Sequence, residues 1–178
     1  MTAFAIEIGE GFCGDGANAA HINTVLGLRD GPVGTAFATA LAQPTPGHVP
    51  FLAVWAPNVP VEPPTLFVNK ATIAGDRHGT LTWGAAQAGV AAGVTAHVAD
   101  RFTRIEIARL ALIVAVWVNP DASDDDLVYR NNCAATRDAL DRGYAAASGN
   151  VGSVSTTAIA ELAAGRAPRN PYFTPRGS

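Results

Sequence analysis

The sequence predicts a single α+β domain folded as a two-layer α/β sandwich. Three observations support this prediction. The length of 178 residues suits one domain. The expected elements follow one another in the order ββαββαβα, with no internal repeat. Charged residues make up only 15% of the chain, which indicates extensive buried or subunit-facing surface. We expect the domain to span residues 1–147, followed by an extended tail over residues 148–178.

Two strands are expected near the start of the chain. Apolar alternation predicts a short strand over Phe4–Ile8 and a longer one over His21–Leu28. Side chains two positions apart share a face of a strand, so His21 and Asn23 should lie together. Residues 9–19 (GEGFCGDGANA) are rich in glycine and are expected to form an ordered loop.

Proline-rich segments separate the next elements. Asp30 is expected to cap a helix with Pro32 in its first turn, because proline suits that position. The segment PTPGHVP should end this helix. A short buried strand is then expected over Phe51–Trp55, and PNVPVEPP should form a rigid connection after it.

The middle of the chain predicts two strands on either side of a helix. The first strand is expected over Thr65–Ile73, with Lys70 and Thr72 on one face. The alanine-rich stretch 81–99 predicts a helix that is loosened by three glycines. The apolar, β-branched segment Leu110–Val118 predicts a central strand.

Two further helix starts carry capping signals. Thr103 and Glu106 have the spacing of a capping box, which predicts a short helical turn. Ser123 and Asp126 repeat that spacing and predict a long helix through about Ala146. Acidic residues in the first turn suit the positive end of its dipole.

Composition argues against several classes of function. The net charge is −3 and the eleven arginines are scattered, so neither nucleic acid nor an anionic membrane is an expected partner. The first residues lack the pattern of a signal peptide, and the longest apolar run is too short to cross a membrane. Cys13 and Cys133 form no C-x-x-C pair and are expected to be reduced thiols in the cytoplasm.

Three common site motifs are absent or incomplete. Gly9, Gly11 and Gly14 have the spacing of a dinucleotide-binding loop, but a strand rather than a helix is expected to follow. The four histidines lie in separate elements with no cysteine at ligand spacing, so no metal site is expected. No G-x-S-x-G motif indicates a hydrolase triad.

Three polar residues are candidates for a site. His21 opens a strand directly after a rigid loop, and imidazole exchanges protons near neutral pH. The alternative is a hydrogen-bonded structural histidine. Lys70 is the only lysine, which suggests a place for a compact ammonium, although its amine can simply reach solvent. The amide of Gln87 offers donors and an acceptor to the edge of a heterocycle.

A series of short motifs extends this picture. In order, they are Gly9-Glu10, Gly14-Asp15-Gly16, Ala20-His21-Ile22, Thr35-Ala36-Phe37, Gly47-His48, Leu52-Ala53-Val54, Ala56-Pro57-Asn58, Asn69-Lys70-Ala71-Thr72-Ile73, Trp83-Gly84-Ala85-Ala86-Gln87 and Tyr129-Arg130-Asn131-Asn132. From about residue 4 to residue 146, this series resembles the formaldehyde-activating enzymes of methylotrophic bacteria and some archaea.

The resemblance implies a function and a site. Such enzymes condense formaldehyde with the co-substrate tetrahydromethanopterin, without a metal, to give methylene-tetrahydromethanopterin and water. It further implies a cytoplasmic homopentamer, a fold like the second domain of ribosomal protein S5, and a pterin site at a subunit boundary. The family's proton donor falls on His21. Its pterin-contacting positions fall on Asn23, Leu52, Lys70, Thr72 and Gln87.

Two positions depart from the family pattern. Asn23 stands where the family usually has an aspartate; the amide keeps the size and hydrogen-bonding capacity but loses the negative charge. The segment Trp83–Gln87 replaces an FGPAQ-like one. Two alternatives therefore stay open. One is a non-catalytic homologue that binds a reduced pterin or senses formaldehyde, and the other is the same condensation with another reduced pterin or folate.

Overall fold

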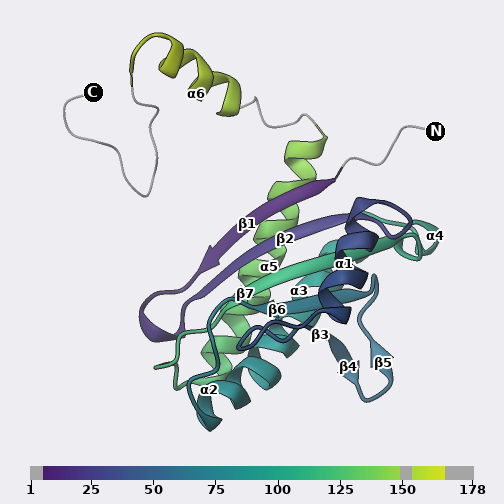
Figure 1. Cartoon of the computed structure of the whole chain (residues 1–178), viewed down its shortest axis with the longest axis vertical. Coiled ribbons are helices and arrows are strands. Elements are labelled where there is room, and N and C mark those ends of the chain that lie inside the picture. The colour runs from purple at the N-terminus through teal and green to yellow at the C-terminus, as the bar shows by residue number, and fades with distance from the viewer. Residues whose placement is uncertain (1–5, 149–153, 167–178) are drawn as a thin grey trace.

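The computed structural model describes residues 6–148 and 154–166 and has the predicted α+β sandwich architecture (Figure 1). A five-stranded sheet runs in the order β1 (Glu7–Cys13), β2 (Ala20–Leu28), β7 (Leu110–Trp117), β6 (Thr65–Asn69) and β3 (Phe51–Leu52). All neighbouring strands are antiparallel except β6 and β7. The parallel pair needs a crossover, which the helices between β6 and β7 provide.

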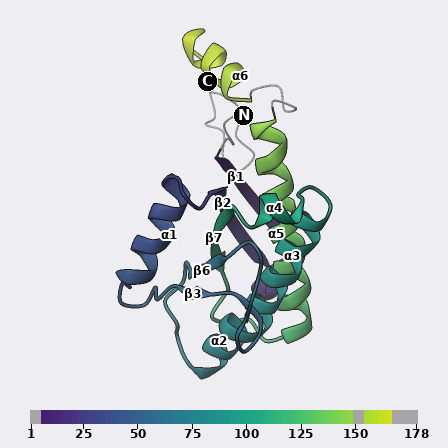
Figure 2. The same ribbon diagram turned by 90° about the vertical axis from the view of Figure 1, so that its right-hand side faces the viewer.

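Helices cover the two faces of the sheet unequally. The helices α3 (Gln87–Ala99) and α5 (Asp125–Ala147) pack against one face, and α1 (Pro32–Ala42) lies on the other (Figure 2). The core fills the space between the sheet and α3 and α5, and its fully buried side chains include Ile22, Phe67, Leu112, Val90 and Val94. One face of the sheet is thus closed by helices, while α1 covers the other only in part.

The loop expected over residues 9–19 is shorter in the structure, because residues 9–13 belong to a strand and only residues 14–19 connect it to β2. Strand β1 includes Gly9 and Gly11 and pairs along its whole length with β2. A Cβ on Gly9 would lie 1.8 Å from the carbonyl oxygen of Ala139, and one on Gly11 2.1 Å from that of Ala135. These glycines therefore let β1 lie directly against the backbone of α5. Of the strand expected over Phe4–Ile8, the first two residues lie outside the described ranges.

The second strand agrees with its prediction, whereas the cap after it does not. In β2, Ile22 and Thr24 are buried, and His21 and Asn23 lie on the opposite, half-exposed face. The N-cap of α1 is Gly31 rather than Asp30, with proline at the first helical position.

The segment expected as one buried strand and a rigid connection forms three short strands, of which the last two make a hairpin. Strand β3 ends at a bend at Ala53, whose N–H donates to Thr65 and whose carbonyl accepts from Val61. Strands β4 (Val54–Ala56) and β5 (Val59–Pro60) then pair with each other. Asn58 takes a positive φ of 65° in their turn, a conformation that asparagine tolerates.

Strand β6 is shorter than expected and ends at Asn69. The Asn69 side-chain amide donates to the carbonyls of Gly47 and Ala71, both at 2.8 Å, which turns the chain away from the sheet. The Lys70 N–H still donates to the Val116 carbonyl. Thr72 lies beyond the strand, so the prediction that it shares a strand face with Lys70 is wrong.

The alanine-rich helix consists of three segments. Helix α2 (Asp76–Leu81) passes into a π-helical turn, η2 (Thr82–Ala86), and then into α3. The glycines Gly89 and Gly93 do more than loosen α3, since a Cβ on either would lie less than 3 Å from a backbone oxygen of α5. They allow the two helices to pack closely.

The later elements largely match their predictions. Helix α4 (Arg104–Ile107) begins with the expected capping box, and β7 fills the expected central strand. The N-cap of α5 is Asp124 rather than Ser123, and its side chain accepts from the N–H of Leu127 at 2.9 Å.

The C-terminal segment departs from the extended tail that was expected. Residues Val154–Ala163 form helix α6, because this stretch is rich in alanine and other helix-forming residues. The boundary between the domain and the C-terminal segment, expected after residue 147, stays a prediction. Among the described residues, no helix is both long and apolar enough to span a membrane.

Candidate active site

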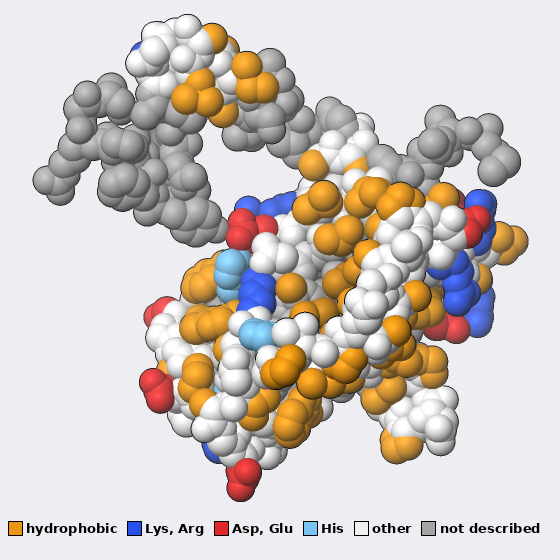
Figure 3. All heavy atoms as spheres, viewed as in Figure 1, with side chains coloured by type: hydrophobic (Ala, Val, Ile, Leu, Met, Phe, Trp, Pro, Cys, Tyr) orange, Lys and Arg blue, Asp and Glu red, His pale blue; other side chains and the backbone are white. Residues whose placement is uncertain are grey.

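The sheet face opposite α3 and α5 carries hydrophobic side chains exposed to solvent. On β1, Ile8 is 68% exposed and Phe12 is 58% exposed, with Glu10 between them. Val25 of β2 and Trp117 of β7 are half-buried on the same face. Figure 3 shows this face, where acidic, histidine and basic side chains gather among hydrophobic ones.

A histidine–carboxylate pair lies on this face. His21 and Phe12 are opposite each other across β1 and β2, and Glu10 is opposite Asn23. The Glu10 side chain reaches diagonally to His21, where its Oε1 lies 2.7 Å from Nε2. The two side chains come from neighbouring paired strands, so the backbone ladder fixes their relative position.

The contact with Glu10 determines which imidazole nitrogen carries the hydrogen in the neutral ring. A carboxylate only accepts hydrogen bonds, so Nε2 of His21 carries the hydrogen that it donates to Glu10. In the neutral ring, Nδ1 is then the acceptor. In the imidazolium, Nδ1 holds the proton that can be transferred.

Two more polar groups complete the cluster. The Asn23 amide lies 3.5 Å from the same Oε1 of Glu10. Lys70 extends its ammonium across the end of β2 and donates to the His21 carbonyl at 3.2 Å. The hydrogen bond from His21 and the one from Asn23 lower the pKa of Glu10, which keeps it ionised. Burial lowers the pKa of Lys70, and the charge of Glu10 opposes that effect.

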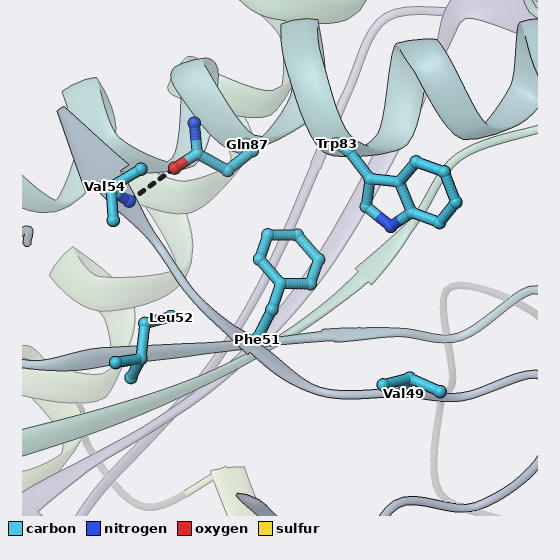
Figure 4. Close-up of a pocket in the computed structure, with 6 residues that line it drawn as sticks. All are labelled: Val49, Phe51, Leu52, Val54, Trp83 and Gln87. Atoms are coloured by element: carbon cyan, nitrogen blue, oxygen red, sulfur yellow. Dashed lines mark hydrogen bonds between the residues drawn. The ribbon is translucent and has the colours of Figure 1, made fainter. Parts of the chain in front are cut away.

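A second candidate region lies at the other edge of the sheet. It is a pocket of about 420 Å³, lined by Val49, Phe51, Leu52, Val54, Trp83 and Gln87. Figure 4 shows the Phe51 ring between the Gln87 amide and the Trp83 indole. The Gln87 Oε1 accepts from the Val54 N–H at 2.5 Å, and Trp83 is 57% exposed on the π-helical turn. The volume and the mainly apolar lining are typical of a small-molecule pocket.

A third group of residues surrounds Thr72. Its side chain is exposed and approaches Gly47, whose φ of +78° forms a tight turn. His48, the residue after Gly47, donates from Nδ1 to the Asn69 carbonyl at 2.8 Å. In the neutral ring, Nε2 is then the acceptor.

The structure divides the six predicted site residues among these regions. It brings His21, Asn23 and Lys70 into one cluster, and it puts Leu52 and Gln87 at the pocket. The cluster lies on the open face of the sheet, whereas Gln87 belongs to the helical layer on the opposite side.

Glu10 is the site residue that the sequence analysis missed. A strand was not expected beyond residue 8, so the alternation Ile8, Glu10, Phe12 was not interpreted as one face of a strand. The same alternation is the signal that would have identified Glu10. No group of three or more histidine, cysteine or acidic side chains that could hold a metal is found among the described residues.

The fold and the cluster together define the class of protein. An ionised carboxylate bonded to a histidine, with an ammonium beside them, is an arrangement suited to proton transfer. An apolar pocket and an exposed apolar sheet face accompany it. These are features of an enzyme that performs acid–base chemistry on a small molecule.

Comparison with known proteins gives the particular family. The family model described as "Formaldehyde-activating enzyme (Fae)" matches residues 8–164, and the chain belongs to this family. The 5,6,7,8-tetrahydromethanopterin hydro-lyase of Methanosarcina barkeri is 44% identical over 136 residues, which are 76% of each chain. The "Bifunctional enzyme Fae/Hps" of Methanosphaerula palustris is 39% identical over 137 residues. That match covers 76% of this chain and 35% of the relative, so the chain spans about a third of such bifunctional relatives.

Proposed function

We propose that this protein condenses formaldehyde with tetrahydromethanopterin to give methylene-tetrahydromethanopterin and water. The observation that carries the proposal is the His21–Glu10 pair, with 2.7 Å between Nε2 and Oε1, beside the Lys70 ammonium in a member of this family. The name of the M. barkeri relative, a tetrahydromethanopterin hydro-lyase, indicates the co-substrate.

His21 acts as the general acid in the proposed mechanism. A secondary amine of the pterin adds to formaldehyde and gives a carbinolamine. The imidazolium of His21 then donates its Nδ1 proton to the hydroxyl group, which leaves as water, and an iminium ion remains. A second amine closes the five-membered ring, and the proton that it loses restores the imidazolium. General acid catalysis of this kind contributes about 10²–10⁴-fold.

The pterin site is proposed to lie between two subunits. One subunit contributes His21, Asn23 and Lys70 from its open sheet face, and its neighbour contributes Leu52 and Gln87 from the pocket. Two observations support this arrangement: Gln87 belongs to the helical layer, whereas the cluster lies on the open face of the sheet, and this open face exposes Ile8 and Phe12. An apolar face of this kind is typical of subunit interfaces.

The remaining elements of the proposal concern assembly and binding. We propose a cytoplasmic homopentamer, as the family resemblance implies. Thr72 would contact the pterin beside the Gly47 turn. The apolar walls of the pocket would hold the two amines and the formaldehyde carbon in reactive geometry, which itself accelerates ring closure.

The central test measures condensation by His21→Ala and by the shape-conserving His21→Asn. The rate with the wild-type protein should exceed the uncatalysed rate, and both variants should lose about 10²–10⁴-fold of kcat. Pterin affinity, measured by titration calorimetry, should change only a few-fold. A wild-type rate in either variant would contradict the acid role of His21.

The same assay separates the alternatives. A wild-type protein that binds the pterin without accelerating condensation would be a binding or sensing homologue. Faster turnover with tetrahydrofolate than with tetrahydromethanopterin would instead assign the condensation to a different co-substrate. The matched control is Asp30→Asn, an exposed charge at the far end of β2, which should keep the full rate.

A further inference from the structure

We propose that Glu10 is the positioning residue of the general acid and that it supplies the negative charge which Asn23 lacks. This inference rests on the proposed function, because it concerns how the proposed general acid His21 is held. Glu10 does not touch the reacting atoms in this proposal. It acts through the imidazole.

The geometry assigns Glu10 to the orientation of the ring. Its Oε1 accepts from Nε2 of His21 at 2.7 Å, which fixes both the ring plane and the tautomer. Phe12 supports the ring from the side, with 6.4 Å between the ring centroids. Nε2 is thereby occupied, and Nδ1 is the ring nitrogen from which His21 would deliver a proton to a ligand on the open face.

Glu10 is also the only carboxylate among the described residues that contacts His21. On β7 the residue opposite His21 is Trp117, which carries no charge. Lys70 extends from beyond β6 and puts an ammonium beside the His21 carbonyl. Glu10 therefore supplies the negative charge of this cluster, in direct contact with the ring.

Asn23 contributes through Glu10 rather than through the ligand alone. Its amide nitrogen lies 3.5 Å from the same oxygen that bonds His21. An aspartate at this position would put a second carboxylate beside Glu10, and two close carboxylates repel each other. With asparagine at position 23, Glu10 provides the one negative charge beside His21, and the Asn23 amide helps to hold the Glu10 carboxylate in place.

Three variants separate the charge of Glu10 from its hydrogen bond. Glu10→Gln keeps an acceptor for Nε2 without the charge. Glu10→Ala removes both. The double variant Glu10→Gln with Asn23→Asp moves the negative charge across to β2. Asp30→Asn serves as a control for loss of an unrelated surface carboxylate, and circular dichroism verifies that each variant is folded.

We expect a distinct pattern in the kinetics and in the tautomer. Glu10→Gln should lower kcat roughly tenfold with little change in KM. The double variant should recover most of that loss. Nitrogen NMR of labelled histidine should show the hydrogen of neutral His21 on Nε2 in the wild type and in Glu10→Gln, but a mixture of the two tautomers in Glu10→Ala.

The outcomes distinguish this inference from the proposed function. If His21→Ala abolishes activity while Glu10→Gln leaves kcat unchanged, the role of Glu10 is wrong and the acid role of His21 stands. If His21→Ala retains the wild-type rate, the proposed mechanism fails, whereas the NMR tautomer still reports whether Glu10 orients the ring. A loss of activity in Glu10→Gln that Asn23→Asp does not rescue would reduce Glu10 to a structural role.

Discussion

Glu7 is a carboxylate two residues before Gly9 whose environment contrasts with that of Glu10. It is only 5% exposed, and its Oε2 has no hydrogen-bond partner within the described structure. Burial raises the pKa of Glu7 to about 7, and the charge of Arg101 offsets this only in part. The folded protein therefore favours the protonated form of Glu7, whereas an unfolded chain ionises it at lower pH.

This difference predicts how stability depends on pH. The raised pKa of Glu7 costs nothing below about pH 4.5, where the group is protonated in both states. Stability is then lost as the pH rises toward 7, by roughly 1–3 kcal/mol. Glu7→Gln removes the titration, so it should raise the free energy of unfolding at pH 8 and leave it almost unchanged at pH 4. Urea unfolding at both values measures this.

His97 provides an internal comparison for that experiment. It is fully buried, and burial lowers its pKa, although the hydrogen bond that its Nδ1 donates to Asp141 opposes the effect. The contribution of His97 to stability has the opposite sign to that of Glu7, since stability falls as acid protonates His97.

A Glu7→Gln variant whose gain in the free energy of unfolding was equal at pH 4 and pH 8 would show that packing, not the ionisation of Glu7, is responsible.

The positions of single side chains could be predicted from the sequence where the two-residue alternation along one strand was sufficient. The alternation in His21–Leu28 correctly put His21 and Asn23 on one face. The contact of Lys70 with His21 joins residues 49 apart in the chain, and only the neighbouring positions of β2, β7 and β6 in the sheet produce it. Glu10 was missed because recognising it required first recognising its strand.

At the scale of elements, the packing of β1 on α5 depends on the absence of side chains. Gly9 and Gly11 bring the strand against the helix backbone, and Gly89 and Gly93 do the same between α3 and α5. From the sequence alone, these glycines indicate loops and loosened helices, because glycine is most often found where the chain turns. A requirement for close approach between elements leaves no local signal in the sequence. This explains why Gly9 and Gly11 were expected in a loop and why Gly89 and Gly93 were expected only to loosen a helix.

Gly11→Ala tests this packing. The new Cβ would lie 2.1 Å from the carbonyl oxygen of Ala135, so strand and helix must separate. We expect a loss of about 2–4 kcal/mol in the free energy of unfolding, measured by urea denaturation, since overpacking at backbone contacts cannot relax locally. The separation should also displace Glu10, the next residue along the strand.

Gly84→Ala is the matched control. No atom lies within 4 Å of a Cβ at Gly84, so the same added methyl group should be neutral or slightly stabilising. Equal losses of stability in Gly11→Ala and Gly84→Ala would contradict the proposed contact between β1 and α5.

The three-part division of the helix around Gly84 was not predicted, because a π-helical turn has no distinct sequence pattern.

At the scale of the whole molecule, the pocket lies at the β3 edge of the sheet, with Gln87 in the helical layer, whereas His21 lies on the open face of β2. The proposed site between subunits therefore predicts complementation. His21→Ala and Gln87→Ala should each be inactive as pure oligomers. Mixed oligomers, made by co-expression with two different tags, should regain activity, because about a quarter of randomly formed boundaries combine an intact cluster with an intact pocket.

The control uses two lesions in the same region. A mixture of His21→Ala with Lys70→Ala subunits damages the cluster at every boundary and should stay inactive. No recovery in the first mixture would mean that each subunit holds a complete site. Recovery in the control would mean that His21 and Lys70 act from different subunits. The fold class itself was predicted from the order of elements, but a boundary between copies of the chain involves no pattern within one sequence.

The division of the proposed site between two subunits has a consequence for stoichiometry. A linear string of subunits leaves one cluster unused at one end and one pocket unused at the other. A closed ring has as many boundaries as subunits, so every half-site finds its complement. Full catalytic yield per polypeptide would then require ring closure, whatever the number of members in the ring.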